Sequence, residues 1–205
     1  MTSLPGGGRH IGLLVLAASL HLPASARAET PHAYSLEGRY FFGQPEDPNP
    51  IVKIYVSGDR HRVESYFDGK LRQIKIVRPD RRVLYLTSES PRTYEERSFE
   101  KLGIARWPEG DRGHSSLEEY RAREREGKLV LTPMGSETIN GQACEKYSIA
   151  FNKHVVFHLW VSTATGFPVL RTMPGSSARV EWSNLKVAPQ PAGLFEPPRG
   201  YRKVP

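Results

Sequence analysis

The chain has 205 residues, with 29 Lys and Arg against 22 Asp and Glu, a formal net charge of +7 and a single cysteine. This length suffices for one ordinary domain, and one cysteine excludes an intramolecular disulfide. The basic residues are dispersed along the chain rather than clustered, so no nucleic-acid partner is expected.

Residues 1–28 are expected to form a cleavable export signal. Arg9 precedes an almost wholly apolar run over 11–22, and the small residues Ala26 and Ala28 stand where cleavage requires them. The run is shorter than the roughly 20 residues of a membrane span, and no later segment approaches that length, so no transmembrane segment is expected. The domain 29–205 is then predicted to be a soluble protein outside the cytoplasm.

Alternating apolar and polar residues, broken by turn residues, dominate the rest of the chain. Asp68-Gly69 and Asn140-Gly141 are among the strongest hairpin signals. Sequential hairpins make a meander, and a meander of about ten strands has to curl because large twisted sheets do not stay flat. The predicted fold class is therefore mainly β, a single curled antiparallel meander with one or two short helices. In chain order the expected strands are 34–42, 52–56, 62–67, 71–77, 82–87, 93–99, 128–132, 144–151, 154–163, 167–173 and 178–187.

One helix is expected where the strand pattern is interrupted, in an insertion over about 101–127. Ser116 and Glu119 form a capping box at its start, and Gly127 is placed to end it. Its apolar side consists of Leu117 and Tyr120. Such a helix can lie on the rim of a sheet, but it has little to bury.

The chain shows no residue pattern typical of an enzyme, so a non-enzymatic protein without cofactor or metal is expected. His154 and His158 would lie about 13 Å apart in a strand that rises about 3.3 Å per residue, too far to share one metal ion. His61 and His114 have no carboxylate or thiolate neighbours at ligand spacing and are interpreted as surface histidines. Catalytic groups brought together from distant loops stay an alternative.

The apolar residues at alternate strand positions are expected to share one face of the sheet. Antiparallel sheets bury one face whether or not they bind anything, so this face is either an ordinary filled core or a ligand cavity. The candidate ligand-binding residues on it are Val52, Ile54, Val56, Val63, Phe67, Ile74, Ile76, Leu84, Leu86, Phe157, Leu159 and Val161.

Several stretches combine strand-forming and turn-forming residues in a distinctive order. They are 54–64 (IYVSGDRHRVE), 77–86 (VRPDRRVLYL), 135–151, 160–168 (WVSTATGFP) and 183–201, which contains SNLKV and LFEPPRGY. These stretches resemble the periplasmic lipoprotein-carrier superfamily of LolA, LolB and the RseB N-terminal domain, most closely an uncharacterised exported LolA-like branch. The resemblance covers most of residues 50–202. It implies an unclosed half β-barrel whose concave apolar face is covered by helices and accepts acyl chains.

The resemblance implies a soluble periplasmic binding protein that holds a lipid or a lipoprotein acyl chain in the concave face. The basic rim residues Arg60, Arg62 and Arg78 are expected to meet anionic headgroups. The true carriers begin with a long helix, whereas residues 28–36 form a short segment with Pro31 that runs almost directly into a strand.

Two further expectations concern the remaining segments. The alternative function is an envelope protein-interaction or stress-sensing module with a filled core, which would bind a protein through a sheet edge or the 101–127 insertion. The proline-rich stretch over about 188–205 is expected to form an extended strap across the barrel, anchored by Leu194, Phe195 and Tyr201.

Overall fold

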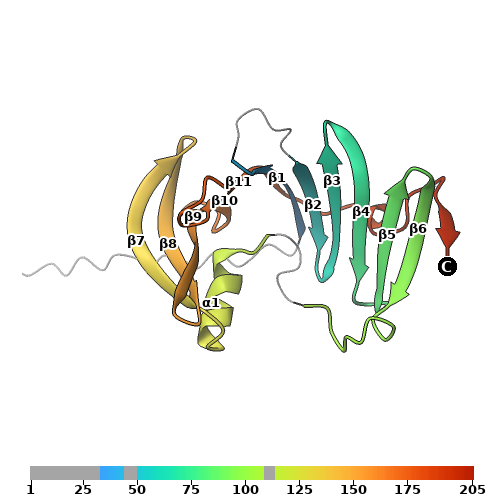
Figure 1. Cartoon of the computed structure of the whole chain (residues 1–205), viewed down its shortest axis with the longest axis horizontal. Helices are drawn as coiled ribbons and strands as arrows, with labels where there is room; N and C mark the ends of the chain where they lie inside the picture. The colour runs from blue at the N-terminus through green and yellow to red at the C-terminus, as the bar shows by residue number, and fades with distance from the viewer. Residues whose placement is uncertain (1–32, 44–49, 109–113) are drawn as a thin grey trace, which may run out of the picture.

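The computed structural model describes residues 33–43, 50–108 and 114–205, so the export signal expected at 1–28 lies outside the described residues. The described strands form one sheet in the order β12-β6-β5-β4-β3-β2-β1-β11-β10-β9-β8-β7, with β12 and β7 at its two open edges (Figure 1). The predicted class, a mainly β fold with an open curled sheet, is confirmed. The elements are β1 (Ala33–Phe41), β2 (Ile51–Ser57), β3 (Arg60–Phe67), β4 (Lys70–Arg78), β5 (Val83–Glu89), β6 (Arg92–Ser98), α1 (Leu117–Arg125), β7 (Val130–Ile139), β8 (Gln142–Phe151), β9 (His154–Ser162), β10 (Pro168–Thr172), β11 (Arg179–Val187), a 3-10 turn η1 (Ala192–Phe195) and β12 (Arg202–Val204).

The sheet consists of two meanders that are joined by a long-range pairing. Strands β1 to β6 follow one another as antiparallel neighbours, and so do β7 to β11; β1 then pairs with β11, with Gly38 opposite Trp182. A Cβ at Gly38 would lie 3.2 Å from Cδ1 of Trp182, so glycine lets the indole lie against β1. The connection between the meanders, from β6 to β7, carries α1.

Cross-strand partners define two faces of the sheet. One row joins Tyr34, Val56, His61, Val77 and Leu84, each directly opposite the next. We call this side the inner face. The intervening residues point to the opposite side, which we call the outer face.

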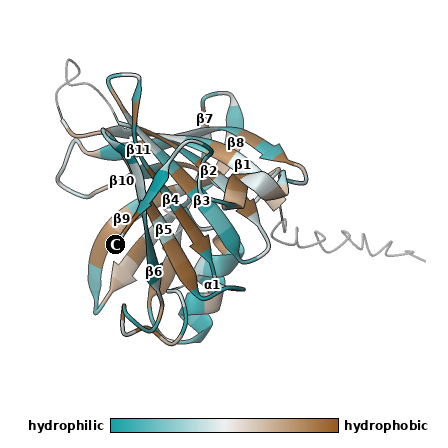
Figure 2. Ribbon diagram, turned by 90° about the vertical axis from the view of Figure 1, so that its right-hand side faces the viewer, coloured by the Kyte–Doolittle hydropathy of each residue, from teal (hydrophilic) through white to brown (hydrophobic). Residues whose placement is uncertain are grey.

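Helix α1 packs against the inner face of the second meander. Its capping box is present, because the Ser116 hydroxyl accepts from the Glu119 N–H and the Glu119 carboxylate accepts from the Ser116 N–H. Tyr120 is its buried residue, and the Tyr120 ring lies 6.0 Å from that of Phe157 on β9. Figure 2 colours most of this helix hydrophilic. α1 therefore covers only part of the inner face.

Candidate functional site

Ten of the twelve proposed ligand-binding residues lie on strands or strand ends of the inner face. Five of them are buried in its hydrophobic clusters: Ile54, Val56, Leu84, Leu159 and Val161. Four are only half-buried beside those clusters: Val52, Val63, Leu86 and Phe157. Phe67, at the end of β3, is 41% exposed. The inner face is thus partly a filled core and partly an accessible apolar surface.

Ile74 and Ile76 do not share that face, so the prediction that all twelve residues lie together is wrong for these two. In β4, Arg72 is an extra residue: Ser65 pairs with Gln73, whereas Tyr66 pairs with Leu71. This bulge places Lys75, rather than Ile74, opposite Val63. A shift of one residue moves every following side chain to the other face of a strand.

The three arginines predicted as a headgroup rim instead contact the C-terminal segment on the outer face. Arg62 Nη1 donates to the Leu194 carbonyl oxygen at 3.1 Å, and Arg78 Nη1 donates to the Phe195 carbonyl oxygen at 3.2 Å. The Arg60 guanidinium lies 5.1 Å from the centre of the Phe195 ring. Arg62 and Arg78 are buried. The rim assignment is therefore wrong for these two residues, because they hold backbone carbonyls of this segment.

Acidic partners complete the contacts of Arg62 and Arg78. Arg62 forms an ion pair with Glu64 at 2.6 Å, and Arg78 pairs with both Asp80 and Glu196. The hydrogen bond from Arg78 holds the pKa of the Asp80 carboxyl below its ordinary value. The two guanidinium groups are held by these carboxylates, and their remaining hydrogen bonds fix the position of residues 194–196.

The two histidines interpreted as surface residues are both buried. His61 is 1% exposed and His114 is 4% exposed. The His114 ring stacks on Phe167 with 5.1 Å between centroids and meets Trp182 edge to face at 5.3 Å. Burial, with a smaller effect of the Arg171 charge, lowers the pKa of His114 to about 3. His114 is therefore a neutral member of an aromatic cluster.

Arg171 is an inner-face residue that the sequence reasoning missed. It lies on β10 opposite Leu159 and Val180, and its guanidinium is 5.5 Å from the Phe157 ring and 5.6 Å from the Trp182 ring. Among the described residues, no carboxylate lies within 4.0 Å of it. One signal in the sequence could have identified it. Arg171 stands in a short expected strand, at a position where the two-residue alternation predicts an apolar residue.

A groove of about 510 Å³ opens between the segment that follows β6 and the end of α1. Trp107, which packs beside the cluster of Val77, Leu84 and Phe99, lines one side. Arg123, whose guanidinium lies 5.7 Å from the Tyr120 ring, lines another. The groove therefore lies between the two inner-face clusters. Its full lining is Arg106, Trp107, Pro108, Arg123, Glu126, Lys128 and Phe151.

The groove is predominantly basic. Arg106, Arg123 and Lys128 outnumber its one carboxylate, Glu126, which is bound to Lys128 at 2.7 Å. The side-chain hydrogen bond from Lys128 also lowers the pKa of Glu126. An anionic group would be attracted to this opening.

Within the described ranges, no group of three His, Cys, Asp or Glu side chains is placed to hold a metal ion. No helix in those ranges has the length and apolar character needed to cross a membrane.

The described residues form an open twelve-stranded sheet with a helix on its inner face, and this fold is shared with solved structures, so the predicted resemblance is supported at the level of the fold. Its structure is similar to that of an uncharacterised conserved protein from Thermus thermophilus, with a TM-score of 0.57 and 10% identity over 85% of this chain and 90% of that one. It is also similar to MucB in the MucA/MucB complex of Pseudomonas aeruginosa, with a TM-score of 0.50 and 16% identity over 79% of this chain and 54% of that one. At these identities the likeness concerns the fold. No protein-family model and no curated protein matches the chain.

Proposed function

We propose that this chain is an exported, non-enzymatic periplasmic protein that binds a single-chain amphiphile, such as a lipid or a lipoprotein acyl chain, on its inner face. The observation that carries the proposal is the half-buried apolar surface formed by residues that pack against the two inner-face clusters: Val52, Val63, Leu86, Trp107 and Phe157. Apolar surface that the fold leaves partly exposed is a favourable environment for an acyl chain.

Charge supports an amphiphile with an anionic head. Trp107 of this surface lines the basic groove, and the Arg171 guanidinium lies 5.5 Å from the centre of the Phe157 ring. Arg106, Arg123 and Lys128 thus take the headgroup role that the sequence had suggested for Arg60, Arg62 and Arg78. A headgroup carboxylate or phosphate would gain charge-assisted hydrogen bonds there.

Val63 provides a direct test of this surface. Replacing Val63 with aspartate places a carboxylate on the half-buried apolar surface, so we expect the affinity for a fluorescent fatty acid to fall about tenfold or more. Titration of the purified protein with the probe measures this effect. The matched control is Val187→Asp at a valine that is 61% exposed at the end of β11, where no change is expected.

Thermal melts of both variants establish that they are folded. If the wild-type protein shows no saturable binding of the fatty acid, the proposed function is rejected. Native mass spectrometry of protein purified from the periplasm without detergent, followed by lipid extraction, would identify the class of the natural ligand.

A protein-interaction function is the second candidate, and the β7 edge favours it. β7 is ten residues long, most of its side chains are exposed, and it has a neighbour on one side only. An extended segment of a partner can add to such an edge through main-chain hydrogen bonds. A photoreactive residue at Met134, which is 49% exposed, should then crosslink one defined protein in the intact envelope. Absence of a defined crosslink counts against this function.

A further inference from the structure

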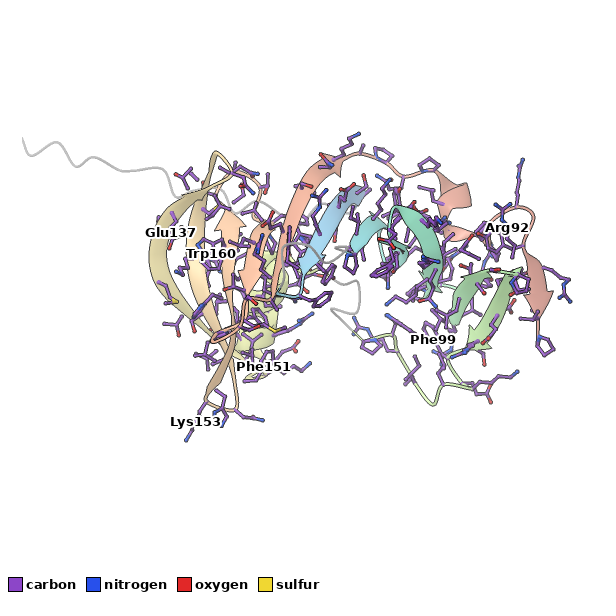
Figure 3. The ribbon with its side chains drawn as sticks, turned by 45° about the horizontal axis from the view of Figure 1, so that its top comes forward. Arg92, Phe99, Glu137, Phe151, Lys153 and Trp160 are labelled. Atoms are coloured by element: carbon purple, nitrogen blue, oxygen red, sulfur yellow. The ribbon has the colours of Figure 1, made fainter. Side chains whose placement is uncertain are left out.

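The end of the β8–β9 hairpin exposes a group of large apolar side chains. Val130, at the start of β7, is 55% exposed and Val155 is 47% exposed, while Phe151 and Val156 are each 36% exposed. These residues, together with Lys153, are called the hairpin tip. Figure 3 shows Lys153 projecting from the far end of the hairpin, with Phe151 close behind it. A cluster of exposed apolar side chains at one end of a molecule is typical of an interaction surface.

The strand register explains why these side chains stay exposed together. Val130 is opposite Ala150, and Ala150 is opposite Val155, so the two valines flank a small residue on the outer face. A bulge follows, because Ile149 pairs with Phe157 and leaves Val156 without a partner. Such bulges redirect side chains. The result is an apolar tip that no described segment covers.

Basic residues adjoin this apolar tip. Asn152 and Lys153 form its turn, both with positive φ, a backbone conformation that is unfavourable for lysine. Lys128 stands just before β7, and Phe151 lines the basic groove together with Arg106 and Arg123. Apolar side chains with cationic ones beside them complement the interface of an anionic bilayer, where hydrocarbon lies beneath phosphate groups.

We propose that the hairpin tip docks on the surface of an anionic lipid bilayer. Phe151, Val155 and Val156 enter the boundary between headgroups and acyl chains, and Lys153 contacts lipid phosphates. This inference goes beyond ligand binding on the inner face and does not depend on it. Because Phe151 also lines the groove, docking would place the groove opening beside the bilayer.

Vesicle flotation tests the proposal. The protein is purified in the form that the expressing cell produces after any N-terminal processing. Wild-type protein is expected to float with vesicles of phosphatidylethanolamine and phosphatidylglycerol and to remain unbound with phosphatidylcholine vesicles. The V155S/V156S double variant should bind about tenfold more weakly, because it removes two exposed apolar side chains. The Lys153→Glu variant should lose about fivefold or more on the anionic vesicles.

Matched phenylalanines provide the control. Phe151→Ser should weaken binding, whereas Phe42→Ser, at a phenylalanine that is 66% exposed just after β1, should leave it unchanged. Lys153→Glu changes only a turn side chain, so it remains informative if the valine variant does not fold. The proposal is overturned if wild-type protein floats with neither vesicle or equally with both, or if Phe42→Ser weakens flotation as much as Phe151→Ser does. It is also overturned if the tip variants abolish a dimer detected by ultracentrifugation without changing flotation. Fatty-acid titration of the same variants reports separately on the inner face.

Discussion

Replacing Phe195 with alanine is expected to lower the free energy of unfolding by about 3–5 kcal/mol. Phe195 is fully buried on the outer face, where it forms a cluster with Ile74, Ile76 and Tyr85. Truncation removes most of its ring contacts and leaves a cavity above the two isoleucines. Urea denaturation monitored by circular dichroism measures the change.

The neighbouring leucine is the matched control for this substitution. Leu194 is only partly buried beside the same cluster, so Leu194→Ala is expected to lower the stability by less than half as much. A loss below about 1 kcal/mol for Phe195→Ala would contradict the packing described here. It would mean that the C-terminal segment does not stabilise the sheet in solution, despite the contacts of Arg62 and Arg78 with its carbonyl groups.

The second large effect is a loss of stability in acid that depends on His114. Its pKa is about 3 in the folded protein, against about 6.5 for an ordinary histidine, because burial disfavours the charged ring. Between these two values the unfolded chain binds a proton that the folded chain does not. The contribution to stability is therefore complete above pH 6.5 and is lost as the pH falls toward 3, at about 1.4 kcal/mol per pH unit.

At pH 4.5 this amounts to about 3 kcal/mol relative to the stability well above pH 6.5. His114→Phe keeps an aromatic ring against Phe167 but removes the titration, so its stability should fall less steeply with acid than that of the wild type. Urea titrations at a series of pH values from 7 to 4 test the difference. His154→Gln, at an exposed histidine, should retain the wild-type slope. Equal slopes for wild type and His114→Phe would show that His114 is accessible to protons in the folded state.

Much of the site was out of reach of sequence reasoning, and β4 shows why. Alternation over Ile74, Lys75, Ile76 and Val77 correctly predicts two faces, but it does not say which set faces inward. Counting straight back from the Asp68-Gly69 turn, Val63 would face Ile74; the extra residue Arg72 makes it face Lys75 instead. No local feature of the sequence marks that bulge.

The basic residues were misjudged for a related reason. An arginine is expected at the surface unless its charge finds partners, and the partners of Arg62 and Arg78 include carbonyl groups of residues 194 and 195, far away in the sequence. The burial of His114 likewise depends on Phe167 and Trp182, which belong to distant segments. Such environments arise only when the segments pack together.

The local structure of this protein follows from its sequence. Two-residue alternation indicates the strands, Asp68-Gly69 and Asn140-Gly141 indicate hairpins, and Ser116 with Glu119 indicates the start of the helix. These features depend on backbone preferences and hydrogen bonds within a few residues, so they can be recognised along the chain. Packing between distant segments sets the pairing of β1 with β11, the face of the sheet on which Ile74 and Ile76 lie, and the position of the basic groove. Those depend on register and on contacts between segments that are distant in sequence, where many arrangements satisfy the same alternation and packing selects one of them.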